Sequence, residues 1–422
     1  MLTLTAIRTQ TQEIIERLAK RGIDRTADIQ QILSLDESKR AKQTLLEQNL
    51  AKGNVLAKEI GDLFKSGNKE AADEKKAESI ELKEAAKVLE TELTELDNQL
   101  TQKLYEIPNA PAAKVVFGKT PEENETVYEW GVDPILPANA KPHWELTSQY
   151  DIIDFELGNK ITGAGFPVYK GKGARLQRAL INFFLDEAIK AGYYEVQPPI
   201  LVNEASGYGT GQLPDKEGQM YHDKTDNLYL IPTAEVPITN IYRDVILKEE
   251  ELPIRNVGYT PCFRREAGSY GAHVRGLNRL HQFDKVEIVQ IAHPTQSYEI
   301  LESMLEHVKM LMTKLGLKFR ILRLCGGDMG FASAMTYDFE AWSGAQQRWL
   351  EVSSVSNFET FQANRLKCRY KTKDGKNELA HTLNGSALAL PRIVASLLEN
   401  NQTETGINLP ECLHPYLGFT SI

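Results

Sequence analysis

Several features that would place a chain in a common functional class are missing from this sequence. No run of about 18 apolar residues occurs, so no segment is expected to span a membrane. The first residues lack the ordered charged, apolar and cleavage regions of a secretory signal, so we expect a cytoplasmic protein. The 422 residues contain neither a GxxxxGK phosphate loop nor a GxGxxG motif after a strand. A bound nucleotide would therefore be held by charged side chains.

Cysteine is also scarce. The four cysteines lie more than 40 residues apart without a CxxC pair, at positions 262, 325, 368 and 412. We therefore expect no zinc site, and no disulfides in a reducing compartment. The net charge of −9 argues against a protein that coats nucleic acid in general. A specific RNA partner remains compatible with this charge, because a local patch can bind RNA on an acidic protein.

Proline is absent before Pro108, and aromatic residues are nearly absent from this part of the chain. A heptad-like seam predicts a coiled coil, and its residues are Leu82, Ala86, Leu89, Leu93, Leu96 and Leu100. A less regular stripe precedes it, at Leu46, Leu50, Leu56, Ile60 and Leu63. The turn residues 65–68 between the stripes predict two antiparallel helices, 33–64 and 69–107. Such a hairpin could serve dimerisation, or it could be an arm that contacts a large ligand through lysines near its tip.

The remaining sequence predicts an α+β fold. A proline-rich linker over 108–145 is followed by helices at 174–191 and 295–315. The strands predicted around the second helix lie at 228–232, 257–263, 282–291, 319–324, 337–342 and 349–352. Strands that follow one another without an intervening helix favour an antiparallel sheet. The chain length favours two domains.

Residues 262–287 carry the strongest chemical signal. An Arg-Arg-Glu triplet, a glycine-containing stretch and a return to apolar alternation predict a strand, a long loop and a second strand. Arg264 and Glu266 would share one face, and Phe283, Lys285 and Glu287 would share a face of the return strand. Arginine binds phosphate oxygens through a charged planar fork, so the hairpin suits a polyphosphate. The alternative is a surface ion pair beside a core phenylalanine.

Two further polar segments could contribute to the same site. Glu351 and Ser353 would point one way along a strand and Ser354 would start a turn, so that a carboxylate and a hydroxyl could bind a hard cation. Residues 381–392, HTLNGSALALPR, predict a polar loop that leads into an apolar helix. Pro391 would either kink that helix or occupy its first turn. Either segment alone is equally compatible with an ordinary surface element.

Together these segments resemble the three signature motifs of class II aminoacyl-tRNA synthetases, and in detail those of bacterial-type seryl-tRNA synthetases. Residues 192–203 (GYYEVQPPILVN) resemble motif 1, a dimer-interface element, while 262–287 resemble motif 2 and 384–392 resemble motif 3. The segments more specific to the seryl branch are GTGQLP at 209–214, IPTAEV at 231–236 and TLNGS at 382–386. The match extends over nearly all of the chain.

The resemblance implies a tRNA-binding domain over 1–110, whose helical arm at about 33–107 docks on tRNA(Ser), and a class II catalytic domain over 111–422. The catalytic domain would form an antiparallel sheet, and the protein a homodimer. Serine and ATP would first give seryl-adenylate and pyrophosphate, and the serine would then pass to the 3′-terminal hydroxyl of tRNA(Ser), and of tRNA(Sec) where one is present. Residues 269–279 would form the motif 2 loop that contacts the tRNA acceptor end.

The resemblance also implies roles for single residues. Arg264 would hold the α-phosphate of ATP and the serine carboxylate, Glu266 the adenine side and Arg392 the γ-phosphate, and these three are the implied catalytic residues. Further contacts to ATP would come from Arg265, Phe283, Glu351, Val352, Ser353 and Ser354. Serine would also be bound by Thr233, Ala234, Glu235, Glu287, Thr382 and Ser386. Mg²⁺ would be held by Glu351 and Ser354.

Two positions depart from the commonest family pattern. Arg265 adds a second cation, and Pro391 precedes the motif 3 arginine where glycine is common. Two rival functions also remain: an adenylating relative that loads a carrier protein, and a coiled-coil scaffold with an inactive synthetase domain. The long helical arm disfavours the first, and the presence of Arg264, Glu266 and Arg392 disfavours the second.

Overall fold

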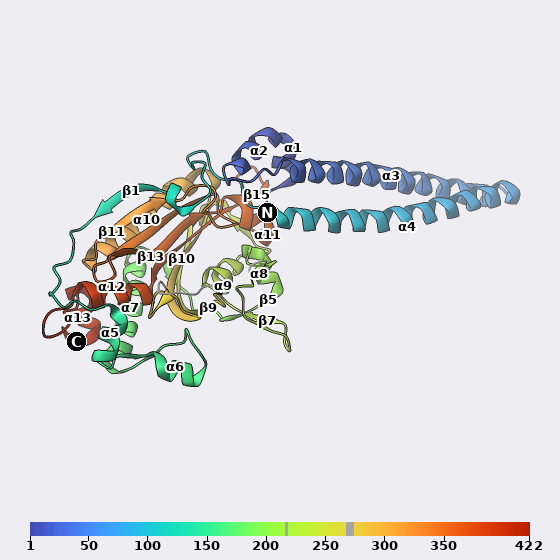
Figure 1. Ribbon diagram of the computed structural model, residues 1–422. Helices are drawn as coiled ribbons and strands as arrows, with labels where there is room; N and C mark the ends of the chain where they lie inside the picture. Colours follow the sequence, from blue (N-terminus) through green and yellow to red (C-terminus); the bar gives the residue numbers. More distant parts are fainter. Residues whose placement is uncertain (216–217, 267–273) are drawn as a thin grey trace. The chain divides into compact units, whose positions relative to one another are not determined.

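The computed structural model describes residues 1–215, 218–266 and 274–422. Helices make up most of one unit, which comprises Leu2–Ala19 and Ile23–Pro108. Its elements are α1 (Leu4–Thr9), α2 (Thr11–Ala19), α3 (Thr26–Lys65) and α4 (Lys69–Glu106). Figure 1 shows α3 and α4 as two long antiparallel helices joined by a short turn. The first of them begins at Thr26, seven residues before the predicted start.

The predicted seam on α4 is confirmed, because each of its six residues is buried or half-buried. On α3 the predicted stripe is wrong at Leu50, whose side chain is exposed. The positions that face α4 recur at Leu46, Asn49 and Gly53, so Leu50 lies one residue beyond the seam. Asn68 caps α4 by accepting a hydrogen bond from the Ala71 amide at 3.4 Å. The hairpin is thus held by a narrow apolar seam along its length.

The other unit comprises Met1, Lys20–Gly22 and Asn109–Ile422. It is built on an eight-stranded sheet in the order β1-β11-β12-β13-β16-β10-β9-β4. The strands are β1 (Glu125–Trp130), β4 (Tyr194–Glu195), β9 (Ile254–Phe263), β10 (Gln282–Ala292), β11 (Phe319–Arg323), β12 (Met335–Ser343), β13 (Arg348–Asn357) and β16 (His381–Ala389). Among the described residues of this sheet, only β4 and β9 pair in parallel, so the predicted antiparallel sheet is confirmed.

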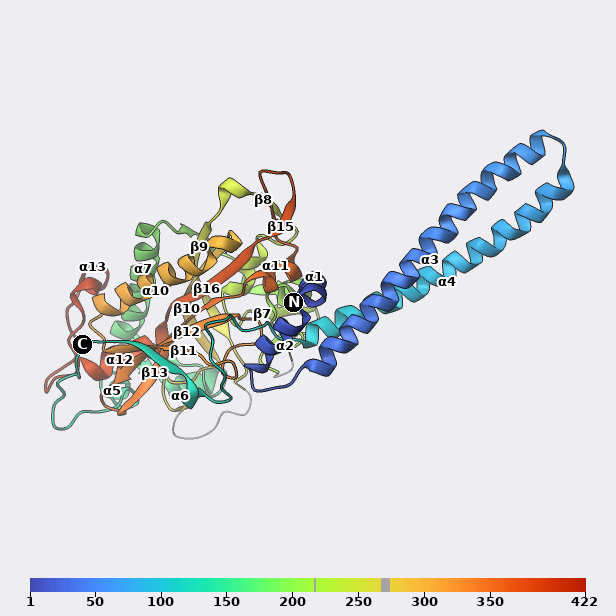
Figure 2. The same ribbon diagram turned by 90° about the horizontal axis from the view of Figure 1, so that it is seen from above.

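The two faces of this sheet have different side chains. Val286 and Ile288 of β10 point into the main apolar core, which also contains residues of the helices α7 (Gly171–Lys190), α10 (Ser297–Lys314) and α12 (Leu390–Asn400). Lys285 and Glu287 alternate with them and therefore face the other way. Figure 2 shows these helices beside the sheet. The polar face is also buried at several predicted site residues, among them Glu287, Thr382 and Ser386.

Shorter elements complete this unit. The helices are α5 (His143–Gln149), α6 (Phe155–Ile161), α8 (Glu204–Thr210), α9 (Glu235–Asn240), α11 (Thr360–Leu366) and α13 (His414–Leu417). The remaining strands form three small sheets and are β2 (Ile153–Asp154), β3 (Val168–Tyr169), β5 (Leu201–Asn203), β6 (His222–Asp223), β7 (Leu228–Leu230), β8 (Ile246–Lys248), β14 (Arg369–Lys371) and β15 (Asn377–Leu379). Of the residues that the structure describes, no helix is long and apolar enough to cross a membrane.

Two local predictions are wrong. The stretch predicted as a linker contains β1, whose mostly exposed side chains gave no alternating signal. The segment 381–389, predicted as a loop, is the strand β16. Its small polar residues belong to a strand because both of its edges pair, with β10 and with β13. Small polar side chains therefore line the interior of the sheet at this point.

Candidate active site

The hairpin of β9 and β10 ends at the mouth of the site. Phe263 is the last residue of β9 and pairs with Gln282, and the Arg264 amide continues the ladder by donating to the His281 carbonyl at 2.9 Å. Glu266 lies beyond the strand with a φ of +47° and accepts a hydrogen bond from Arg279. The prediction that Arg264 and Glu266 share one face of a strand is therefore wrong. A turn separates them.

Arg264 lies where two parts of the site meet. Its Nε donates to the Pro232 carbonyl at 3.3 Å, and its guanidinium carbon lies 5.3 Å from the centre of the Phe283 ring. This cation–π contact leaves no space for a base between the two groups. A stacked base would therefore use the other face of Phe283. Arg265 is exposed, and its backbone amide donates to the Gln219 carbonyl at 2.9 Å.

One buried network of hydrogen bonds joins four of the residues predicted to bind serine. Thr233 donates to Glu287 at 3.3 Å, and the Glu235 amide donates to the Thr233 hydroxyl at 3.2 Å. Gln362 donates to Glu235 at 2.6 Å and accepts from the Thr382 hydroxyl at 2.7 Å. These hydrogen bonds run from β10 through α9 and α11 to β16. Side chains from four separate segments are thus brought together.

Two carboxylates face this small volume. Glu287 is almost fully buried and pairs with Lys285 at 2.6 Å. Burial, and then the nearby Glu287 carboxylate, raise the pKa of Glu235 to about 7, while hydrogen bonding to Gln362 opposes the shift. Ala234 is buried at the N-cap of α9, and Ser386 lies opposite Glu287 in the strand register. This cluster of side chains is therefore polar, acidic and shielded from water.

The strand β13 holds the predicted metal residues in an unexpected way. Ser354 pairs with Asp338 and Glu351 with Glu340, with a register shift between these pairs. The bulge places Glu351 and Ser354 on the same face. Ser353 instead pairs with the core residue Phe339, so the prediction that it points the same way as Glu351 is wrong.

The same strand bears on two further predictions. Ser354 lies within β13 and does not start a turn, which differs from the expectation. Val352 also packs in the apolar core, so only its backbone is available to a nucleotide. The backbone of Ser386 accepts a hydrogen bond from the Ser353 hydroxyl at 2.6 Å. Ser353 therefore joins β13 to β16 and supports the floor of the site.

Arg392 enters the site from the start of α12. Pro391 occupies the first turn of this helix, where a missing backbone N–H costs nothing. The helix is therefore not kinked at this residue. Arg392 donates through Nε to the Asn278 carbonyl at 3.1 Å and through Nη1 to the Glu351 carbonyl at 2.7 Å. The Arg392 guanidinium thus joins the segments predicted as motif 2 and motif 3, which are more than a hundred residues apart in the sequence.

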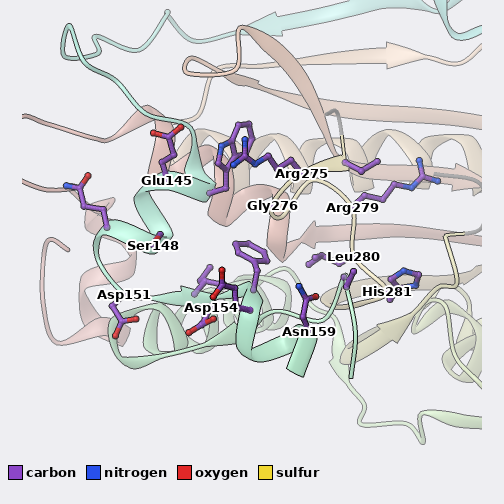
Figure 3. A pocket seen from close by; sticks show the side chains of 18 of the residues that line it. Glu145, Ser148, Asp151, Asp154, Asn159, Arg275, Gly276, Arg279, Leu280 and His281 are labelled. Atoms are coloured by element: carbon purple, nitrogen blue, oxygen red, sulfur yellow. The ribbon is translucent and has the colours of Figure 1, made fainter. Parts of the chain in front are cut away.

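A cavity of about 1140 Å³ adjoins this site. Figure 3 shows Arg275, Gly276 and Arg279 lining one side and residues of α5 and α6 lining the other. Glu266 lines the cavity, but none of the residues predicted to bind the amino acid serine does. Residues 269–273 of the predicted motif 2 loop lie outside the described residues, and of that loop only 274–279 are described. The cavity therefore borders the predicted nucleotide side of the site.

Several residues at the site were not predicted from the sequence. Gln362, Lys285 and Asn278 each contact a predicted residue, as described above. Asp338 faces Ser354 across two strands. Lys285 could have been found, because it lies two residues from Glu287 on the same face of a predicted strand. Gln362 offers only a weak signal, a polar residue on an otherwise apolar face of a short helix.

Known families match both parts of the chain. The model described as "Seryl-tRNA synthetase N-terminal domain" matches residues 1–111. The model described as "tRNA synthetase class II core domain (G, H, P, S and T)" matches residues 219–401. A serine–tRNA ligase of Salinibacter ruber is 48% identical over 100% of this chain and 99% of its own length. The chain belongs to the seryl-tRNA synthetase family.

Other relatives agree with this membership. A serine–tRNA ligase of Akkermansia muciniphila is 45% identical, over 99% of this chain and 98% of its own length. The seryl-tRNA synthetase of Pyrococcus horikoshii, solved as a complex with ATP, has a TM-score of 0.94 at 33% identity, and 100% of this chain and 99% of that chain are covered. The cytoplasmic serine–tRNA ligase of Naegleria fowleri, in complex with AMP, has a TM-score of 0.88 at 26% identity, with 100% and 98% covered.

The raised pKa of Glu235 predicts a pH dependence of stability within this synthetase fold. The folded state binds this proton more tightly than the unfolded state, whose pKa is near 4.5. Stability from this group is therefore present at low pH and is lost as pH rises towards about 7. Since a shift of one unit corresponds to about 1.4 kcal/mol, the loss is on the order of 3 kcal/mol.

Glu235→Gln keeps an acceptor for Gln362 and removes the titration. We expect the free energy of unfolding of the variant to fall less than that of the wild type between pH 5 and 8. Urea unfolding followed by tryptophan fluorescence measures it, because all four tryptophans belong to the unit that holds the site. Glu250→Gln, at an exposed position, should follow the wild-type curve. Parallel curves for wild type and Glu235→Gln would contradict the prediction.

Proposed function

We propose that the chain attaches L-serine to tRNA(Ser) in two steps, with ATP as the energy source. The observation that carries this proposal is the position of Arg264. One side of its guanidinium contacts Phe283 on the nucleotide side, and the other donates to Pro232, which precedes the serine segment. A single cation can thus neutralise an α-phosphate and a serine carboxylate together. Adenylate formation requires that the serine carboxylate and the α-phosphate of ATP meet at one place.

In the first step, the serine carboxylate attacks the α-phosphorus and pyrophosphate leaves. No side chain has to act as a nucleophile. The residues instead hold the two reactants in line and neutralise the charge that develops on the phosphates, with Arg264 near the α-phosphate and Arg392 near the γ-phosphate. Glu266 contacts the adenine side, and Phe283 stacks on the base through the ring face that Arg264 leaves open. Arg265 and the backbone at Val352 and Ser353 complete the nucleotide contacts.

Mg²⁺ fits the corner formed by Glu351 and Ser354. Asp338 lies opposite Ser354, and its Oδ1 is buried without a hydrogen-bond partner. Burial, and then the Glu351 carboxylate, raise the pKa of Asp338 well above its ordinary value. Oxygen ligands of this kind suit a hard cation, and when bound it would neutralise charge on the phosphates. Among the described residues no group of three or more His, Cys, Asp or Glu could hold a metal, so phosphate oxygens would supply the remaining ligands.

Serine is selected by the buried network. The ammonium group would pair with the ionised Glu235, and the hydroxyl would contact Glu287 and Thr382. Thr233, Ala234 and Ser386 enclose the rest of the amino acid. A pocket built to hydrogen-bond a hydroxyl excludes an analogue that lacks it, because the buried groups of the pocket are then left unpaired.

In the second step the 3′-terminal hydroxyl of tRNA attacks the activated carbonyl. We assign residues 1–110 to a tRNA-binding domain and 111–422 to catalysis, with the helical arm and the motif 2 loop as the tRNA contacts. The assignment is supported by the long helical hairpin and by the location of all the adenylation residues in the other unit. tRNA(Sec), where it is present, would be served by the same chemistry at the 3′ end. The enzyme would act in the cytoplasm, where these substrates occur.

We further propose a homodimer formed through the motif 1 segment. The strand β4 lies at an edge of the large sheet, and Tyr194 within it is 72% exposed. Ile200 and Leu201 follow close by and are exposed as well. Exposed apolar side chains at a free sheet edge favour pairing with another chain. The dimer would cover this surface.

Replacing Arg264 by Ala tests the first step. We expect serine-dependent ATP/pyrophosphate exchange to fall at least about a hundredfold, because a preorganised cation is lost from the developing charge. Thermal stability should change little, since the side chain is only partly buried. Arg369→Ala on β14, outside the site, should keep wild-type exchange. Exchange that survives in Arg264→Ala would contradict the assignment.

Serine selection is tested at Glu287 and Thr382. In Glu287→Gln and Thr382→Ala we expect the ratio of kcat/KM for serine over alanine to fall at least about tenfold, because a hydrogen bond to the substrate hydroxyl is weakened or lost. The ratio is measured by ATP/pyrophosphate exchange with each amino acid. Thr336→Ala removes another buried, hydrogen-bonded threonine and should leave the ratio unchanged. An unchanged ratio in both pocket variants would argue against this pocket.

Shortening the arm separates the two steps. Residues 48–87 can be replaced by a short Gly-Asn turn, because Lys42 and Glu92 lie next to each other across the hairpin at 2.6 Å. We expect serine-dependent pyrophosphate exchange to remain within about twofold of wild type, and aminoacylation of tRNA(Ser) to fall by at least about a hundredfold as phosphate contacts are lost. Full aminoacylation by the shortened protein would contradict the role of the arm. Loss of pyrophosphate exchange in the shortened protein would contradict the assignment of adenylation to residues 111–422.

A further inference from the structure

A buried carboxylate at the end of α12 has a costly position. Glu399 is fully buried and lies in the last turn of the helix, where the helix dipole disfavours negative charge. Its Oε1 accepts from the His143 amide at 2.9 Å, from His143 Nδ1 at 2.6 Å and from Gln346 at 2.8 Å. Its Oε2 accepts from the Ser343 hydroxyl. Four donors thus stabilise the Glu399 carboxylate, although an apolar side chain could fill the same space.

These contacts define the role of the His143 ring. The carboxylate of Glu399 can only accept, so Nδ1 of His143 carries the hydrogen and Nε2 is left as an acceptor. Nε2 accepts the backbone N–H of Leu277 at 2.8 Å. Gly276 makes this approach possible, because a β-carbon there would lie 2.3 Å from Nε2. His143 therefore links α12 to the segment that leads back into β10.

A second hydrogen-bonded path runs in parallel. Gln346 donates to Glu399 through Nε2 and accepts through Oε1 from Asn278 Nδ2 at 2.9 Å. Leu277 and Asn278 are therefore both fixed, through one intermediate side chain each, to the same carboxylate. Asn278 is 5% exposed and Leu277 is 1% exposed, so these bonds are shielded from water.

The fixed segment, 277–281, touches all three predicted catalytic residues. The Asn278 carbonyl accepts from Arg392, Arg279 donates to Glu266, and the His281 carbonyl accepts from the Arg264 amide. Figure 3 shows part of this segment along one side of the cavity, with residues of α5 on the other side. A shift of the segment would move the three residues together.

We propose that His143, held by Glu399, is a positioning residue for the ATP side of the site. It acts through the Leu277 amide and does not touch ATP itself. This inference rests on the proposed function for its kinetic consequence only, since the hydrogen bonds exist independently of any substrate. Its effect should fall more on ATP than on serine, because the segment reaches the serine side only through the Arg264 amide and makes none of the contacts described above with Glu287, Gln362 or Thr382.

The test uses the full-length chain with His143→Phe, which keeps a flat ring and removes both nitrogens. We expect hydrogen exchange of the Leu277 amide to accelerate at least about tenfold. In serine-dependent ATP/pyrophosphate exchange, KM for ATP should rise on the order of tenfold and kcat should fall, while KM for serine should rise by a clearly smaller factor. His143→Gln offers a carbonyl oxygen near the position of Nε2 and should recover part of both effects.

Two further variants distinguish positioning from lost stability. Leu146→Ala removes a buried side chain from the same helix and leaves the hydrogen bond between His143 and the Leu277 amide in place, so it should lower the melting temperature while KM for ATP stays unchanged. Gln346 is half-buried, and Gln346→Met breaks only the second path. It should raise KM for ATP, but less than His143→Phe does. If His143→Phe fails to fold, a rise of KM for ATP in Gln346→Met still tests the proposal.

The outcomes separate the two proposals. Folded His143→Phe with wild-type exchange at Leu277 and an unchanged KM for ATP would overturn the inference. An equal rise of KM for ATP in Leu146→Ala would also overturn it, because the effect would then follow stability. If the wild-type protein itself shows no serine-dependent pyrophosphate exchange, the proposed function fails, and hydrogen exchange at Leu277 still decides the structural part.

Discussion

The site depends on one constraint: polar side chains on the inner face of the sheet are cut off from water. Glu235, Glu287 and Thr382 are each less than a tenth exposed, so every donor and acceptor among them needs a partner inside the protein. Without an amino acid, the partners are Thr233, Lys285 and Gln362, which close the network. A ligand can enter only by replacing these hydrogen bonds with equivalent ones. A hydroxyl and an ammonium group do so, and a methyl group does not.

The nucleotide side follows the opposite rule. Its charged residues lie beyond strand ends or at a helix start, where water still reaches them. Arg264 follows the last residue of β9, Glu266 lies in a turn, and Arg392 belongs to the first turn of α12. A triphosphate carries more charge than a sealed pocket could neutralise, so partial exposure lowers the cost of binding it. Under the proposed function, the small amino acid would bind in an interior shielded from water, and ATP would bind at the partly exposed edge of the site.

Much of this arrangement was predictable because it is local. The alternation of β10 places Phe283, Lys285 and Glu287 on one face. For Pro391 the sequence left a kink or a place in the first turn of α12 open, and the structure has it in the first turn. The predictions failed where a local rule was overridden by pairing. The bulge in β13 reverses the direction of Ser353, and two flanking strands turn a polar segment into β16. No local signal joins Gln362 to Glu235, or His143 to Glu399, since these pairs form only when distant segments meet. The resemblance to known synthetases supplied the residues proposed to bind substrates, whereas the residues that hold them in place became visible only in three dimensions.

The way the ATP side is held has a consequence for its response to salt. The ion pair of Arg279 with Glu266 is partly exposed, with 41% of the arginine side chain open to solvent, so dissolved ions weaken it. The hydrogen bonds of His143 and Gln346 to segment 277–278 are buried and involve neutral partners, so they are nearly independent of ionic strength. The position of the segment is therefore set from behind, by groups that neither salt nor the charge of the nucleotide disturbs. Under the proposed function, Arg279 and Arg392 would exchange the carboxylates of Glu266 and Glu351 for phosphate oxygens while the backbone at 277–278 stays in place. Preorganisation of this kind lets electrostatic stabilisation act at the moment when charge develops.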